Sequence, residues 1–241
     1  THGPVHAVVL DGEAQVEARA VVVATGVSYR RLDAPGLGEF TGRGVYYGAT
    51  ASEASQCEGD DVYIVGAANS AGQAALNLAR YAKHVVMVVR AASLEATMSQ
   101  YLVTRIRAAS NIDVLCRTEV VGAHGDGHLE SLTLADRESG ATGEVSASWL
   151  FVFIGASPRT EWLGAGLVRD QAGFVVTGQD LLTPAHAGHW PLERAPFALE
   201  TSVPGVFAAG DVRLDSMKRV ASAVGDGAMA VYSVHRYAVT I

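Results

Sequence analysis

A strand, a turn of small residues and a helical pattern follow one another at residues 61–75. The run Val62–Val65 is apolar on both faces, which is typical of a buried parallel strand, and apolar residues recur at helical spacing from Ala71. Small residues between a strand and a helix let unpaired backbone N–H groups approach a phosphate, so this turn is predicted to hold the pyrophosphate of a dinucleotide. The predicted binding residues are Gly66, Ala68, Asn69, Ser70 and Ala71.

The pattern of this turn is Gly66-x-Ala68-x-x-Ala71, which departs from the glycine fingerprint of dinucleotide-binding proteins. The middle glycine position of the fingerprint is occupied by Ala68, whose methyl group takes room from the ligand. An ordinary tight turn between a strand and a helix is therefore the alternative interpretation of this motif.

Arg90 follows the next predicted strand, at residues 84–89, which completes a βαβ unit with a right-handed crossover. In such units an acidic residue about 20 positions past the turn binds the ribose hydroxyls of NAD, whereas an arginine accommodates the extra phosphate of NADP. No acid stands beside Arg90, so the pattern favours NADP. A solvated surface arginine is the alternative, because phosphate sites often have two basic side chains and only one is present here.

Two other predicted strands end in small residues. The first ends at Thr25-Gly26, which indicates a close approach of the backbone to a neighbouring strand or a ligand. The second ends at Gly210-Asp211, which offers a carboxylate at the carboxyl end of a strand, where ligands of open α/β sheets bind. Asp211 is equally suited to capping the helix that follows it.

The rest of the chain alternates between strand and helix patterns, so the predicted fold class is α/β. Further strands are predicted at 5–10, 17–24, 111–116, 120–123, 129–134 and 149–155, and helices at 99–109 and 218–235. Asp11-Gly12 is predicted to join the first two strands as a hairpin. Gly225 and Gly227 each weaken the last helix by about 1 kcal/mol relative to alanine, so we expect close packing of this helix against a ligand or another helix.

Two irregular stretches separate these elements. Glycines and Pro35 between residues 32 and 48 predict a linker and a domain boundary. Residues 177–194 have no clear period and are predicted to form a loop. Their histidines do not repeat at a metal-ligand spacing, so no metal site is predicted.

Composition limits the class of protein. A net charge of −7 argues against a nucleic-acid surface, and no apolar run reaches the roughly 18 residues that a membrane-spanning helix requires. Cys57 and Cys116 lie far apart and form no CxxC motif, which favours a reducing cytoplasm. The N-terminal residues, from Thr1, resemble neither an initiator nor a signal peptide, so we interpret the chain as a piece of a longer protein.

Four motifs, taken in order, resemble the thioredoxin reductase-like branch of the flavoproteins that bind two dinucleotides. They are Ala24-Thr25-Gly26, the Gly66 turn, Phe153-Ile154-Gly155-Ala156-Ser157-Pro158 and Gly205-Val206-Phe207-Ala208-Ala209-Gly210-Asp211. The resemblance implies a Rossmann-like NADP-binding domain inserted into an FAD-binding α/β domain. On this sequence it places the NAD(P)-binding domain at 37–157 and the two FAD-domain pieces at 1–36 and 158–241.

The resemblance also implies a set of cofactor contacts. Asp211 would contact the ribityl and pyrophosphate region of FAD, and the backbone at Arg219 and Val220 would lie against the flavin ring. The other residues carried over with these motifs are Thr25, Gly26 and Gly155. FAD and NADP perform the redox chemistry in such proteins, so no catalytic side chain is predicted. The resemblance further implies a homodimer and a domain rotation, for which the glycine-rich stretch 36–44 is the expected hinge.

Two departures from the family pattern change the expected function. The redox CxxC of the family would fall at Gly48 and Ala51, so dithiol exchange through the protein's own disulfide is excluded. The N-terminal FAD fingerprint GxGxxG is also missing, because the chain starts after it, and the FAD domain is therefore incomplete. The chain also resembles a related group of longer proteins. In these proteins a cyclic-nucleotide-binding domain precedes a reductase half that lacks these cysteines.

The leading hypothesis is thus an NADP-linked flavin oxidoreductase that passes electrons from NADPH through FAD to an acceptor that the sequence does not identify. A nucleotide-binding or regulatory module without stable FAD is the alternative. Disulfide reduction with cysteines supplied by another protein is a third possibility.

Overall fold

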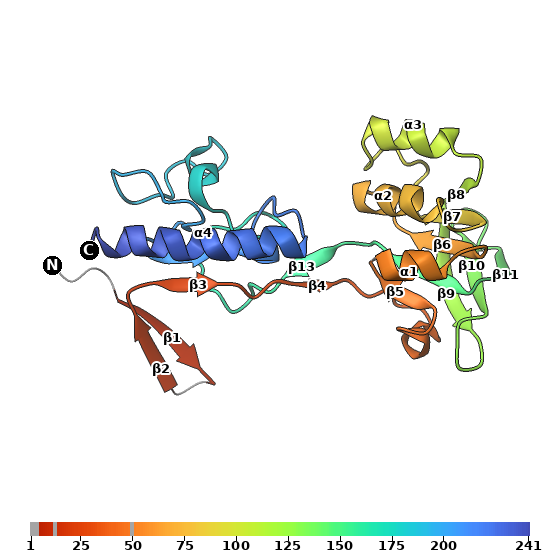
Figure 1. The fold of residues 1–241 in the computed structure, drawn as a ribbon, viewed down its shortest axis with the longest axis horizontal. Helices are drawn as coiled ribbons and strands as arrows, with labels where there is room; N and C mark the ends of the chain where they lie inside the picture. Colours follow the sequence, from red (N-terminus) through yellow and green to blue (C-terminus); the bar gives the residue numbers. More distant parts are fainter. Residues whose placement is uncertain (1–4, 12–13, 49–50) are drawn as a thin grey trace. The chain divides into compact units, whose positions relative to one another are not determined.

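The computed structural model describes residues 5–11, 14–48 and 51–241, with the backbone alone for 51–53. Gly12 of the predicted hairpin turn, and Ala49 and Thr50 between the predicted cysteine-equivalent positions, lie outside the described residues. The chain divides into two compact units, of which the first combines Thr1–Ser28 with Ala156–Ile241 and the second is Tyr29–Gly155 (Figure 1). In sequence, the second unit therefore lies between the two segments of the first.

A parallel five-stranded sheet forms the centre of the second unit. Its strand order is β5-β12-β6-β7-β8, and every pair is parallel. The strands are β5 (Val45–Tyr47), β6 (Asp61–Val65), β7 (His84–Val89), β8 (Ile112–Cys116) and β12 (Trp149–Val152). The predicted strands at 62–65, 84–89 and 111–116 are confirmed. The chain returns to the middle of the sheet at β12, so the strand before the Gly66 turn has β7 on one side and β12 on the other.

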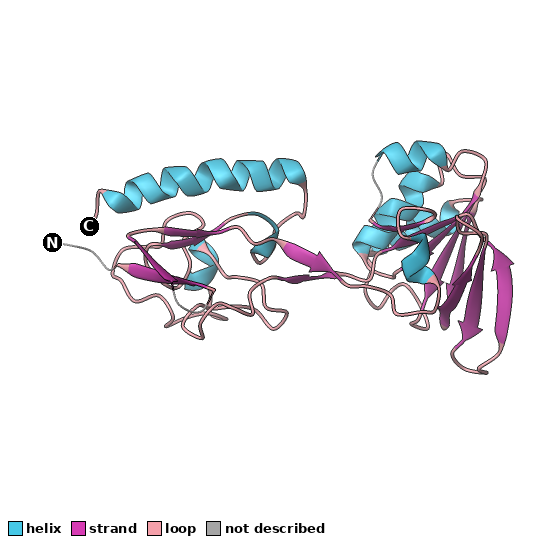
Figure 2. Cartoon of the chain, turned by 90° about the horizontal axis from the view of Figure 1, so that it is seen from below, coloured by secondary structure: helices cyan, strands magenta, loops and turns pink. Residues whose placement is uncertain are grey.

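Helices cover one face of this sheet and a second sheet covers the other (Figure 2). The helices are α1 (Ala51–Gln56), α2 (Asn69–Leu78) and α3 (Gln100–Ala108), and the antiparallel second sheet consists of β9 (Thr118–His124), β10 (Ser131–Asp136) and β11 (Thr142–Ser146). The predicted hairpin corresponds to β9 and β10, whereas β11 was not predicted. Because both faces are covered, the central strands are apolar on both sides.

The glycine-rich stretch of this unit is packed at Gly36 and Gly44, where a linker was predicted within 32–48, and its expected role as a hinge stays a prediction. A Cβ atom at Gly36 would lie 2.1 Å from the carbonyl oxygen of Ala123, and one at Gly44 would lie 2.4 Å from the Cβ of Leu129. Between them the short helix η1 (Leu37–Phe40) buries both of its terminal side chains. These glycines therefore permit close packing against the second sheet, and the boundary between the compact units lies at Ser28 and Tyr29 instead.

The first unit is built around two parallel strands, β3 (Val21–Val23) and β14 (Val206–Ala208), and the long helix α4 (Val220–Ala238). Its other elements are the antiparallel hairpin β1 (His6–Leu10) and β2 (Ala14–Ala18), and the short helices η2 (Gly178–Leu182) and η3 (Gly210–Val212). The strand predicted at 17–24 is two strands, because β2 pairs with β1 and β3 pairs with β14. Strands β4 (Val27–Tyr29) and β13 (Ala156–Pro158) pair with each other. Among the described helices, none combines the length and the apolar character needed to cross a membrane.

A buried carboxylate anchors the loop before β14. Glu200 is fully buried and forms two hydrogen bonds with the guanidinium of Arg194, at 2.8 and 2.9 Å. It also accepts the backbone N–H groups of Phe197 at 2.8 Å and Gly205 at 3.1 Å. A buried charge is costly unless it is paired and hydrogen-bonded, and this one has both kinds of partner. The network therefore fixes the chain between Arg194 and Gly205.

Tyr237, on α4, is packed beside this network with a hydroxyl that makes no hydrogen bond to the described residues. A buried hydroxyl without a partner costs about 1–3 kcal/mol, so Tyr237→Phe is expected to leave the free energy of unfolding unchanged or to raise it. Burial, and then the charge of Glu200, raises the pKa of Tyr237. The unfolded chain thus ionises first, and the variant should also lose less stability than the wild type as the pH rises above about 10. Urea unfolding at neutral and alkaline pH measures both effects, and a clear loss of stability at neutral pH would contradict them.

Candidate functional site

The turn between β6 and α2 has room only for glycine at its first position. Gly66 has φ +146°, and a Cβ atom there would lie 2.5 Å from the carbonyl oxygen of Phe153, which follows β12. The same atom would lie 3.0 Å from the Cβ of Ala71. Gly66 therefore allows the strand, the helix and the neighbouring strand to meet closely, as the first glycine of a dinucleotide turn must.

The first turn of α2 offers backbone donors to an anion. Helix α2 begins at Asn69, and its N-cap residue Ala68 has no side chain that can cap it. The first N–H groups of a helix lack intrahelical partners, and the helix dipole makes this end positive. Ala68 has φ −92° and ψ 176°, a conformation that any residue adopts, so the missing middle glycine does not distort the turn. The donor set at Asn69, Ser70 and Ala71 fits the pyrophosphate of NAD(P).

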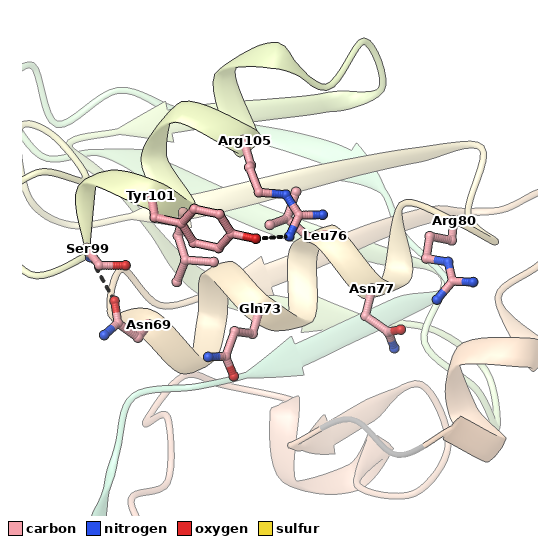
Figure 3. A pocket seen from close by; sticks show the side chains of 9 residues that line it. Asn69, Gln73, Leu76, Asn77, Arg80, Ser99, Tyr101 and Arg105 are labelled. Atoms are coloured by element: carbon pink, nitrogen blue, oxygen red, sulfur yellow. Dashed lines mark hydrogen bonds between the residues drawn. The ribbon is translucent and has the colours of Figure 1, made fainter.

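Two hydrogen bonds tie this turn to the loop after β7. The backbone N–H of Ser99 donates to Oδ1 of Asn69 at 2.8 Å (Figure 3). The hydroxyl of Thr97 donates to the carbonyl oxygen of Ala67 at 2.8 Å. Oδ1 of Asn69 is thus engaged within the protein, which fixes the side chain at the turn and leaves the donors of Asn69, its backbone N–H and its side-chain amide, for a ligand. Sequence reasoning missed both Thr97 and Ser99. Ser99 could have been found from its position just before a helical pattern.

Arg90 begins the loop after β7 and is exposed. Among the described residues its guanidinium has no hydrogen bond or ion pair, whereas its carbonyl oxygen accepts Nη1 of Arg137 at 3.3 Å. Further along the loop, the carboxylate of Glu95 forms an ion pair with Arg107 on α3. Hydrogen bonds from the backbone N–H of Glu95 and the hydroxyl of Ser93 lower the pKa of the Glu95 carboxyl group. The one acidic side chain of the loop is therefore paired, and Arg90 is left with a positive charge facing solvent.

A polar groove of about 340 Å³ lies between α2 and α3 (Figure 3). Asn69 and Ser99 line one end of it, and Arg80 lines the other. The hydroxyl of Tyr101 accepts a hydrogen bond from Arg105 at 2.8 Å on the α3 side. The groove was not predicted from the sequence, because it depends on how the two helices pack.

In the first unit, the Gly-Asp turn lies against the first turns of α4. Gly210 has φ +76°, and a Cβ atom there would lie 3.4 Å from the Cβ of Ala223. Helix α4 has Arg219 as its N-cap residue, and no side chain caps it. The alternative role of Asp211 as a helix cap is therefore wrong. The structure brings Gly210, Asp211 and the start of α4 together, and the side chain of Val220 is 83% exposed there.

Comparison with known proteins identifies the family of this chain. Residues 3–227 match the family model described as pyridine nucleotide-disulphide oxidoreductase. The chain belongs to this family. It is thioredoxin reductase-like: it is 32% identical over 238 residues to the thioredoxin reductase of Peptoclostridium acidaminophilum, covering 95% of this chain and 68% of that protein. It is also 30% identical over 228 residues to an NADH dehydrogenase of Bacillus subtilis, covering 95% of this chain and 41% of that protein.

Solved structures of the same family support the α/β fold. The thioredoxin reductase of Streptococcus pyogenes aligns with a TM-score of 0.75 and 27% identity, covering all of this chain and 72% of that one. The chain therefore spans about two thirds of the length of thioredoxin reductases and less than half of the NADH dehydrogenase.

The residues expected from the family motifs are divided between the two units. Gly155 belongs to the second unit, and its carbonyl oxygen accepts the backbone N–H of Arg30. Thr25 and Gly26 belong to the first unit. There the hydroxyl of Thr25 donates to the carbonyl oxygen of Arg159 at 2.8 Å, and the N–H of Arg159 donates to the carbonyl oxygen of Gly26 at 3.1 Å. The small residues after β3 thus contact the chain just after β13, and their predicted contact with a ligand stays a prediction.

The glycines of α4 do not have the neighbours that the sequence predicted. A Cβ atom at Gly225 or Gly227 would have no described heavy atom within 4 Å. Neither glycine therefore packs closely against another described element, and the expected packing of α4 against another helix is not found at these two positions. The structure instead reveals Asp226 between them, a residue that sequence reasoning missed, with its carboxylate at Gly210.

Proposed function

We propose that this chain is part of an NADP-linked flavin oxidoreductase in which electrons pass from NADPH through FAD to an acceptor other than the protein's own disulfide. The observation that carries the proposal is the Gly66 turn, where glycine lets β6, α2 and the chain after β12 meet closely and the first N–H groups of α2 have no side-chain cap. Membership of the pyridine nucleotide-disulphide oxidoreductase family supports the same chemistry.

Each unit would hold one dinucleotide. In the second unit the N–H groups of Asn69, Ser70 and Ala71 would bind the pyrophosphate of NADPH, and Arg90 would pair with its additional phosphate. In the first unit the Gly210-Asp211 turn and the start of α4 would position FAD. The two cofactors supply hydride transfer when bound, whereas the residues of this chain bind them, orient them and exclude water. We accordingly assign the NAD(P)-binding domain to the second unit and the FAD-domain pieces to the first.

The cysteines of the chain argue against dithiol exchange within it. Cys57 is buried in the core between α2 and the central sheet, and neither it nor Cys116 forms a disulfide bond. A thiolate nucleophile must be accessible and needs a resolving partner. Family positions of the redox pair would be Gly48 and Ala51 in this chain, which lack sulfur. The electron acceptor is therefore proposed to be an external molecule or protein.

Anaerobic reduction tests the proposed function. When NADPH is added to the full-length protein without oxygen, we expect the visible absorbance of oxidised flavin to fall. The reduced protein should then fail to reduce thioredoxin, because this chain has glycine and alanine where the family carries its redox cysteines. Persistence of the oxidised flavin spectrum would contradict the proposal, and a colourless protein that still binds NADPH would favour a nucleotide-binding module instead.

A further inference from the structure

A carboxylate from α4 reaches back to the Gly-Asp turn. Oδ2 of Asp226 accepts the backbone N–H of Gly210 at 3.0 Å and Nε of Arg213 at 2.9 Å. The side chain of Asp226 is 19% exposed and that of Arg213 is 18% exposed, so this ion pair is largely withdrawn from water. A hydrogen bond to a charged acceptor in such surroundings is stronger than one at the surface.

The same pair closes a ring around the turn. Nη1 of Arg213 donates to the hydroxyl of the buried Thr177 at 3.2 Å, and the backbone N–H of Arg213 donates to the carbonyl oxygen of Gly210 at 3.1 Å. Both polar groups of Gly210 are thus occupied, its N–H by Asp226 and its carbonyl oxygen by Arg213. The turn is held from α4 on one side and from the segment before η2 on the other.

The direction of the Asp211 side chain depends on how Asp226 and Arg213 hold the turn. Its side chain is half-buried and, within the described part of the chain, makes no hydrogen bond or ion pair. The backbone of the turn therefore decides where its carboxylate lies. Without Asp226, the N–H of the buried Gly210 would lose its acceptor, and the turn would have to move to find another.

We propose that Asp226, held by Arg213, is a positioning residue that sets the Gly210-Asp211 turn for binding the flavin dinucleotide. This inference rests on the proposed function, because it assigns FAD to the first unit. Asp226 acts through the turn and does not itself touch the cofactor. Gly225 and Gly227 flank it on the helix, where neither position is packed.

The test compares FAD binding by the full-length apoprotein and its variants, followed through quenching of flavin fluorescence. Asp226→Ala is expected to weaken FAD binding about tenfold or more, because a buried N–H loses a charged acceptor. Asp226→Asn keeps an oxygen for Gly210 but loses the ion pair, so an intermediate effect is expected. Asp215→Asn is the matched control: it removes the same charge from an exposed residue at φ +56°, a conformation that asparagine tolerates, and should bind FAD like the wild type.

Two further measurements separate positioning from loss of structure. The visible circular dichroism of bound FAD should change in the Asp226 variants, because it reports how the flavin is held, while the affinity for NADPH should stay at the wild-type value. Unchanged FAD affinity and unchanged dichroism in both Asp226 variants would overturn the inference. If Asp226→Ala fails to fold, Asp226→Asn and Arg213→Gln decide. A wild-type protein that binds no FAD would contradict the proposed function itself, before any variant is compared.

Discussion

Gly66→Ala is expected to weaken NADPH binding by about a hundredfold or more. The added methyl group would lie 2.5 Å from the carbonyl oxygen of Phe153, and the alanine would also have to adopt φ +146°. Backbone strain of this kind costs roughly 1–3 kcal/mol and overpacking costs about the same, while about 1.4 kcal/mol corresponds to tenfold in affinity. The turn must shift to relieve the clash, and the N–H groups of α2 would then no longer converge on the pyrophosphate.

Isothermal titration of NADPH, together with thermal unfolding, measures this effect. Gly143→Ala is the matched control within the same unit, because a Cβ atom there would meet no described heavy atom within 4 Å. The control is expected to bind NADPH normally. Wild-type affinity in Gly66→Ala would show that the turn tolerates a side chain and is an ordinary connection.

Arg90→Glu is expected to lower the preference for NADPH over NADH by about ten- to a hundredfold. A hydrogen bond to a charged group contributes roughly 1.5–3 kcal/mol, and the introduced carboxylate would repel the phosphate that distinguishes the two nucleotides. NADH lacks this phosphate, so its affinity should change little. The effect is expected to be stronger at low ionic strength, because Arg90 is exposed and its charge is screened by salt.

The ratio of kcat/KM for the two nucleotides, measured on the full-length protein, checks this prediction. Arg80→Glu provides a control with the same change of charge in the same unit. Arg80 is exposed and follows the C-terminal end of α2, whereas the proposed phosphate site is at the N-terminal end of that helix. We expect Arg80→Glu to leave the ratio unchanged. An unchanged ratio in Arg90→Glu would mean that Arg90 is a solvated surface residue, the alternative that the sequence left open.

The local patterns of the sequence predicted most elements of the second unit. Val62–Val65 and 84–89 are continuous apolar runs, and the small residues after Val65 mark where the first strand gives way to a helix. These signals are local, because strand and helix periods are set by neighbouring residues. For the same reason the sequence located the Gly66 turn and Arg90 without knowledge of the sheet order. It could not divide 17–24 into two strands, since that division depends on two different pairing partners.

The tertiary structure alone decided why the turn needs glycine and what holds the Gly-Asp turn. The carbonyl oxygen that excludes a side chain at Gly66 belongs to Phe153, which reaches β6 only because β12 returns to the middle of the sheet. Likewise, Gly36 follows a loop-like sequence yet packs against Ala123. In the sequence, nothing distinguishes Asp226 from the other polar residues of a helix. Its contact with the N–H of Gly210 exists only because α4 packs beside that turn. Each contact joins residues distant in sequence, and only the packing of whole elements brings such residues together.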